Sequence, residues 1–283
     1  MERTHKPHHK ETAPLPYPLE STIPTRSSHD WSVRSYESKS GSELRAGSLE
    51  DFEDPCSSLR HFNTMLFIDD SVHMRQHWEE VESLIKVIGP ICTKYDPNGI
   101  DIEFIHHRPR SSFLTGKTGY THIGFATGNP DIPDNVEGIF GRVGPKGKCK
   151  MDRRLSPILD TYLSEYDLNL RRTGRRIMPL NVIIITSGVT DDNPYHTLVR
   201  TARELDKFDA PPYQVGIQFF QVGKEPDATW ALASIDDELS REENVRDIVD
   251  TVTWTGKPGE LSPAALLKVL LGAVKRSIDE MAV

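Results

Sequence analysis

The feature that most constrains the fold is a nearly continuous apolar run at residues 180–185, which ends in Thr186-Ser187-Gly188. A strand with one face in water alternates apolar and polar residues, whereas this run is apolar at almost every position. Such a run is typical of a parallel strand that helices cover on both faces. It therefore predicts an α/β domain.

Strands and helices alternate along the chain from Phe62 onward. Apolar or alternating segments predict further strands at 62–68, 100–105 and 215–222, and the mixed segment 245–252 is short. Apolar residues spaced by three and four predict helices at 74–88, 155–168, 227–239 and 264–278, and the Gly- and Thr-rich stretch 108–134 reads as a loop. This alternation predicts a Rossmann-like, mostly parallel central sheet with helices on both faces.

The first 60 residues differ from the rest in composition. They are rich in Ser, Pro and charged side chains and carry no periodic apolar face. A segment of this kind has too little apolar surface to offset the entropy of folding. We therefore expect a disordered N-terminal tail over 1–60, whose removal leaves the fold intact, and one domain over 61–283.

Composition also bears on location and partners. The net charge of −8 argues against nucleic acid as a partner, because phosphate neutralisation needs a basic surface. Cys56, Cys92 and Cys149 are widely spaced and form no disulfide framework. The stretch 264–274 is interrupted by Lys268 and is too short to span a bilayer. With no secretory signal at the N-terminus, these features predict a cytoplasmic protein.

Two predicted strands end in polar residues. Asp69 follows the first strand, and Ser187 follows the apolar run. In open parallel sheets, ligands bind in the crevice outside the carboxyl ends of the strands. Both residues are therefore expected at that crevice.

Several segments resemble, in the right order, the von Willebrand factor A (vWA) domain, and in particular the single-domain vWA proteins of fungi. The resemblance covers roughly residues 60–281 and is carried by 67–71, 145–147, 181–192, 215–223 and 245–252. It implies the vWA fold and a non-catalytic protein-interaction module that binds its partner at the crevice.

The resemblance also implies a metal ion-dependent adhesion site built from three loops. Asp69 and Ser71 match the first two residues of its Asp-x-Ser-x-Ser motif, and His73 replaces the third. The threonine of the second loop falls on Cys149, and Ser187 stands in place of the aspartate of the third loop. One of the two carboxylates of the family site is therefore lost.

These replacements are expected to weaken or abolish Mg²⁺ binding, since Mg²⁺ prefers hard oxygen ligands and anionic charge. An alternative remains open. Asp69, His73 and Cys149 form a softer donor set that resembles a Zn²⁺ site, which would make the chain a metalloprotein or an enzyme.

Catalysis is otherwise not indicated. Lys148 and Lys150 are expected to lower the pKa of the Cys149 thiol, but no general base is recognisable beside it. Ser71 lacks the Gly-x-Ser-x-Gly elbow of a hydrolase. Asp191 and Asp192 are expected to cap the helix after Pro194.

Two basic clusters lie on this acidic chain. One consists of Arg142, Lys146, Lys148, Lys150, Arg153 and Arg154, and the other of Arg171, Arg172, Arg175 and Arg176. They are either solvated loops that flank one helix or a docking surface for an acidic or phosphorylated segment of a protein partner. No aromatic residues interleave with them, so single-stranded nucleic acid is not expected.

Overall fold

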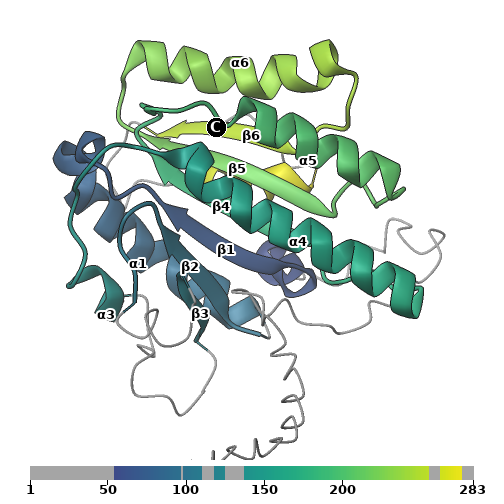
Figure 1. Ribbon diagram of the computed structural model, residues 1–283. Helices are drawn as coiled ribbons and strands as arrows, with labels where there is room; N and C mark the ends of the chain where they lie inside the picture. The colour runs from purple at the N-terminus through teal and green to yellow at the C-terminus, as the bar shows by residue number, and fades with distance from the viewer. Residues whose placement is uncertain (1–53, 97, 110–117, 125–136, 255–261, 276–283) are drawn as a thin grey trace, which may run out of the picture.

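The computed structural model describes residues 54–275 apart from 97, 110–117, 125–136 and 255–261 (Figure 1). The predicted disordered segment therefore lies outside the described residues up to position 53. Within the described part, the chain alternates strands and helices around one sheet, and the α/β prediction is confirmed.

The six-stranded sheet has the order β3-β2-β1-β4-β5-β6 (Figure 1). The strands are β1 Asn63–Ile68, β2 Ile100–Phe104, β3 Tyr120–Ile123, β4 Leu180–Thr186, β5 Val215–Val222 and β6 Val249–Trp254. Every neighbouring pair is parallel except β2 and β3, which are antiparallel. The strand order reverses direction at β1 and β4, which is the topological switch point of a doubly wound sheet.

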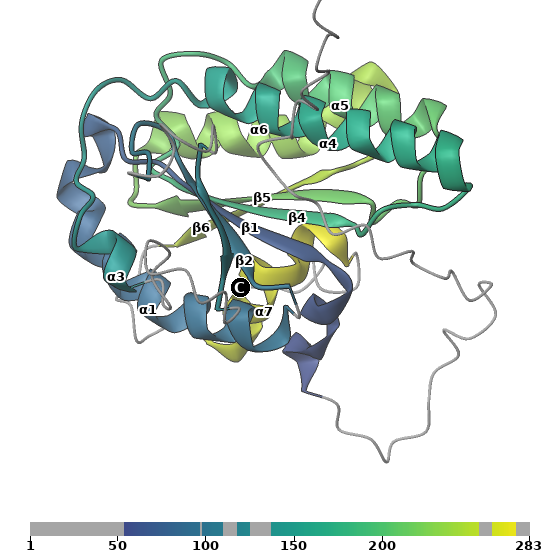
Figure 2. The same ribbon diagram turned by 60° about the horizontal axis from the view of Figure 1, so that its bottom comes forward.

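Helices cover both faces of the sheet (Figure 2). On one face lie α4 Met151–Thr173, α5 Tyr195–Lys207 and α6 Pro226–Glu243, and on the other α1 Trp78–Tyr95 and α7 Pro263–Leu271. Shorter segments are α3 Glu137–Phe140 and the 3-10 helices η1 Pro55–His61, η2 Val72–His77 and η3 Gly272–Val274. Among the described residues, no helix is both long and apolar enough to cross a membrane.

The central strands are buried on both faces because each contributes to two separate cores. In β1, Leu66 and Ile68 pack with α1, whereas Met65 and Phe67 pack with α4. All residues of β4 and β5 are buried. The apolar run at 180–185 therefore has the environment that its composition predicted.

The structure differs from the sequence prediction in the 108–134 region and at the second edge of the sheet. β3 lies inside the predicted loop, because a four-residue edge strand is too short to produce a periodic signal. β6 begins at Val249 and ends at Trp254, later than the predicted segment 245–252. Both differences concern edge strands, which have fewer buried positions than central ones.

The predicted domain boundary at residue 60 falls inside η1. Leu59 is fully buried and Cys56 is 9% exposed, and both belong to the core beside α1. Asp54 caps this short helix by accepting a hydrogen bond from the Cys56 amide at 3.1 Å. The folded unit therefore includes residues 54–60. The prediction missed them because a single buried turn has no periodicity.

Candidate functional site

The pairing of β1 with β4 places the ends of these two strands side by side. Ile68 lies opposite Ile185 in the parallel register, and the Asp69 amide continues the ladder by donating to the Ile185 carbonyl at 2.9 Å. The next residues, Asp69 and Thr186, therefore meet at the switch point, at the carboxyl ends of both strands, and both are fully buried. Asp69 and Ser187 thus lie at strand ends, as the sequence predicted.

The Asp69 carboxylate is fully buried and surrounded by hydrogen-bond donors. One oxygen accepts from the Ser71 amide at 2.8 Å, and the other accepts from the Thr186 hydroxyl at 3.0 Å and the Cys149 thiol at 3.4 Å. Burial raises the pKa of the Asp69 carboxyl, and these hydrogen bonds oppose that rise. Thr186 was missed by the sequence analysis, although it directly precedes Ser187.

The loop before α4 lies directly against the loop after β1. The Lys146 amide donates to the Asp70 carbonyl at 2.8 Å, and the Val72 amide donates to the Gly147 carbonyl at 3.0 Å. Gly147 has a φ of +66°, and a Cβ at this position would lie 2.6 Å from Cε1 of His106. Only glycine fits this close approach, so the turn Pro145-Lys146-Gly147 requires a glycine at its third position.

The loop after β4 fixes Cys149 from the other side. The Asp191 amide donates to the Cys149 carbonyl at 2.8 Å, and the Cys149 amide donates to the Asp191 carboxylate at 2.8 Å. The Thr190 hydroxyl donates to the same Cys149 carbonyl at 3.3 Å. Three loops that are distant in sequence therefore meet around Asp69 and Cys149.

The prediction that lysines activate Cys149 is wrong. The Cys149 side chain is fully buried beside the Asp69 carboxylate. Burial raises the pKa of the Cys149 thiol, and the negative charge of Asp69 raises it further. The Lys148 and Lys150 side chains point elsewhere, toward the Asp191 carboxylate and the Asp191 carbonyl. The thiol is neutral and donates a weak hydrogen bond.

His73 pairs with Asp191, on the outer side of the loops. Its Nε2 lies 3.3 Å from an Asp191 carboxylate oxygen, and both side chains are partly exposed. Partial burial alone would raise the pKa of Asp191, but the hydrogen bonds from His73 and the Cys149 amide, together with Lys148, hold it below its usual value. His73 thus stabilises the third loop.

The residues present do not fit the Mg²⁺ ion that the resemblance implies. The Asp69 carboxylate already accepts three hydrogen bonds, and the neighbouring donor is a neutral thiol. Ser187, where the resemblance leads one to expect a second carboxylate, accepts the Val189 amide at 3.4 Å and carries no charge. Within the part of the chain that the structure describes, no group of three or more His, Cys, Asp or Glu side chains could hold a metal ion.

Two further aspartates have structural contacts. The buried Asp70 carboxylate accepts the amides of His106 and His107 at 2.7 and 2.8 Å, which ties the end of β2 to the site. Asp192 accepts the amides of Asp152 and Arg153, both at 3.1 Å, and so caps the start of α4.

The prediction that Asp191 and Asp192 cap the helix after Pro194 is therefore wrong. α5 begins at Tyr195 without a side-chain cap from either residue. Asp192 instead lies against the first turn of α4, and Asp191 against Cys149. Capping partners across loops depend on tertiary contacts that spacing along the chain does not show.

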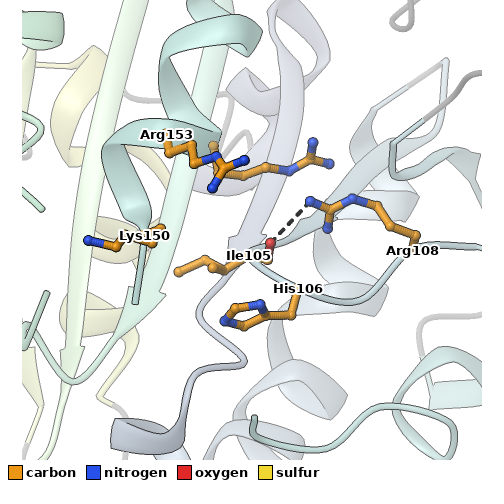
Figure 3. A pocket seen from close by; sticks show the side chains of 6 residues that line it. Ile105, His106, Arg108, Lys150 and Arg153 are labelled. Carbon is orange, nitrogen blue, oxygen red and sulfur yellow. Dashed lines mark hydrogen bonds between the residues drawn. The ribbon is translucent and has the colours of Figure 1, made fainter. Parts of the chain in front are cut away.

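Three members of the first basic cluster, Lys150, Arg153 and Arg154, line a cavity of about 390 Å³ (Figure 3). Lys146 and Lys148 lie on the rim of the site, next to Asp70 and Asp191. The second cluster lies at the opposite end of α4, whose 23 residues span roughly 34 Å. A second cavity, of about 450 Å³, adjoins the third loop and contains Trp230, which is 72% exposed.

Comparison with known proteins adds no identification. No protein-family model matches the chain, and no curated protein matches it.

Proposed function

We propose that this chain is a non-catalytic protein-interaction module of the vWA type, which binds an acidic segment of a protein partner at the crevice without a bridging cation. The observation that carries this proposal is the environment of Asp69. Its carboxylate is buried, and its oxygens already accept hydrogen bonds from a thiol, a hydroxyl and an amide, so this single carboxylate is a poor ligand for a divalent ion.

The arrangement of the loops supports the vWA part of the proposal. The resemblance requires three loops, after the first strand, before the long helix and after the central strand, to meet at one point. Asp69 lies in the first of these loops, and it accepts hydrogen bonds from Cys149 in the second and from Thr186 at the end of the central strand. The strand order and the single antiparallel edge strand are compatible with the same Rossmann-like class.

The surface around the crevice supports an acidic partner. Lys146, Lys148 and Arg153 are exposed on the rim. In a metal-dependent site a cation joins two sets of carboxylates, whereas here lysine and arginine side chains can pair with the partner's carboxylates directly. Trp230 in the neighbouring cavity is a side chain of the kind that dominates binding energy in protein interfaces.

The state of the nucleophile candidates supports the absence of catalysis. Burial raises the pKa of the Cys149 thiol, so it is not a thiolate at neutral pH. The Ser71 side chain is completely buried, which leaves a substrate no access to its hydroxyl.

The proposal is tested by affinity purification from native extract with wild type and Asp69→Asn, each with Mg²⁺ and with EDTA. Asn keeps the shape of Asp69 and an acceptor oxygen but removes the charge that a cation needs. We expect the same partners, in amounts within about twofold, under all four conditions. A Lys146→Ala/Lys148→Ala variant should recover less partner, since it removes rim charge.

A partner that is lost both in EDTA and in Asp69→Asn would contradict cation-free binding. Circular dichroism of Asp69→Asn serves as the control for folding.

A further inference from the structure

The cavity of about 390 Å³ lies between the end of β2 and the start of α4 (Figure 3). Its volume is within the range of about 300–1,000 Å³ that is usual for ligand pockets. It is lined by Ile105, His106, Arg108, Lys150, Arg153 and Arg154. Among the described residues, the lining thus contains four cationic side chains and no carboxylate.

Only part of this positive charge is balanced within the protein. Arg154 forms an ion pair with Glu103, which is fully buried behind the cavity. Lys150 donates to the Asp191 carbonyl at 2.7 Å, so its ammonium group is held at the edge by a neutral partner. In the described part of the chain, Arg108 donates hydrogen bonds to backbone carbonyls, which do not cancel its charge. The cavity therefore has an excess of positive charge.

Three hydrogen bonds to backbone carbonyls fix the guanidinium group of Arg108 in position. Its Nη1 donates to the carbonyls of Phe104 and His107 at 3.0 and 2.7 Å, and its Nη2 donates to the Ile105 carbonyl at 3.1 Å. These bonds use three of the five N–H groups of the guanidinium, which leaves two for a ligand. A guanidinium fixed in this way loses little conformational entropy when it binds.

Arg153 approaches the cavity from the first turn of α4, and Figure 3 shows it on the α4 side of the cavity, with Arg108 on the opposite side. The residue is exposed, and among the described residues its guanidinium takes part in no hydrogen bond or ion pair. The backbone amides of the same turn are already capped by Asp192. A ligand would therefore be bound by the arginine side chains and not by the helix N-terminus.

We infer that this cavity binds the phosphoryl group of a phosphorylated serine or threonine in the protein partner, an inference that rests on the proposed function. A phosphoryl group carries about −1.5 to −2 charges and three acceptor oxygens, so it can accept hydrogen bonds from two guanidinium groups at once. A carboxylate has two oxygens and one charge, and it would leave much of the positive charge unbalanced.

The position of the cavity favours a protein-borne phosphoryl group. His106, which lines it, hydrogen-bonds through Nε2 with the Lys148 carbonyl of the rim at 2.8 Å and through its amide with Asp70 at 2.7 Å. The cavity thus adjoins the loops that surround the crevice where the partner is proposed to lie. A peptide in the crevice can place one side chain in the cavity.

The test measures binding of the purified full-length chain to three fluorescent peptide pools by anisotropy. The pools are degenerate at flanking positions and carry a central phosphoserine, serine or glutamate. We expect the phosphoserine pool to bind at least about tenfold more tightly than the other two. Arg153→Ala should remove most of this preference, since a charge-assisted hydrogen-bonded pair contributes about tenfold or more.

Arg172→Ala is the matched control, because it removes the same charge from an exposed position in the second basic cluster. It should change the affinity for the phosphoserine pool by less than about twofold. Inorganic phosphate serves as the competitor. It should displace the phosphoserine pool only at concentrations far above those of unlabelled phosphopeptide, because it lacks the contacts of the peptide.

Equal binding of the three pools, or equal losses in the Arg153→Ala and Arg172→Ala variants, would overturn the inference. So would displacement by inorganic phosphate as effective as displacement by phosphopeptide, which would assign the cavity to a free anion. If the inference fails while Mg²⁺-independent partner capture persists, the proposed function stands without this pocket. If partner capture also fails, both are wrong.

Discussion

Asp69 is a buried carboxylate that is stabilised by neutral donors. Burying a carboxylate that has no hydrogen-bond partners costs free energy. Three hydrogen bonds to Asp69 offset much of that cost here. Cys149 and Ser187 suit this arrangement, because a thiol can donate to Asp69 and a serine adds no second charge. The site residues are thus consistent with one another without a cation.

Asp96, at the opposite end of the sheet, is expected to make the stability of the protein depend on pH. It is 3% exposed, and its carboxylate accepts the amides of Thr64 and Asn98 at 3.0 and 2.9 Å. Burial raises its pKa to about 7 despite these bonds. The folded state therefore binds this proton more tightly than the unfolded state, in which the pKa of Asp is about 3.9.

Because the folded-state pKa is raised, the contribution of Asp96 to stability is largest below about pH 4 and is lost as the pH rises to about 7. We predict that the free energy of unfolding of wild type, relative to Asp96→Asn, falls across this window by at most about 1.4 kcal/mol per pH unit. Urea denaturation at several pH values measures the difference. A difference that is constant between pH 4 and 7 would show that Asp96 does not titrate in this range.

Among the elements, η1 adds a part of the core that its sequence did not reveal. Leu59 of this short helix is fully buried in the core that lies on the α1 side of the sheet. We predict that Leu59→Ala lowers the free energy of unfolding by about 2–5 kcal/mol, the usual cost of removing a buried leucine side chain. Thermal or urea unfolding of the full-length chain measures this change.

Leu168 on α4 provides the matched control for this substitution. It is 54% exposed, so Leu168→Ala should change the free energy of unfolding by about 0.5 kcal/mol or less. Similar, small effects of the two substitutions would place η1 outside the cooperative folding unit and restore the boundary at residue 60.

At the scale of the whole molecule, the sheet brings the three loops together. The resemblance to the vWA domain can therefore be tested by changing residues in these loops. The triple variant His73→Ser, Cys149→Thr, Ser187→Asp restores the family's five positions. We predict that it gains Mg²⁺ binding, seen by isothermal titration calorimetry and as a rise in melting temperature with added Mg²⁺. The reason is that a second carboxylate supplies the charge that a hard cation needs.

Without Mg²⁺ the same variant should be less stable than wild type, because Ser187 is 2% exposed and an aspartate there would bury a further charge. Adding Asp69→Asn to the triple variant should abolish the gain of Mg²⁺ binding. A folded triple variant that binds no Mg²⁺ would mean that these loop positions are not equivalent to those of the vWA family.

The α/β class, the central strands and the place of Asp69 at a strand end can be predicted from the amino-acid sequence, because they follow from local periodicity and from the burial of apolar runs. The contacts between the loops are visible only in the folded protein. The register of β1 with β4 places Thr186 against Asp69, and the packing of the loops turns Cys149 into a neutral donor and Asp192 into the cap of α4. Such contacts join residues that are far apart in the chain, so neither spacing nor composition can show them.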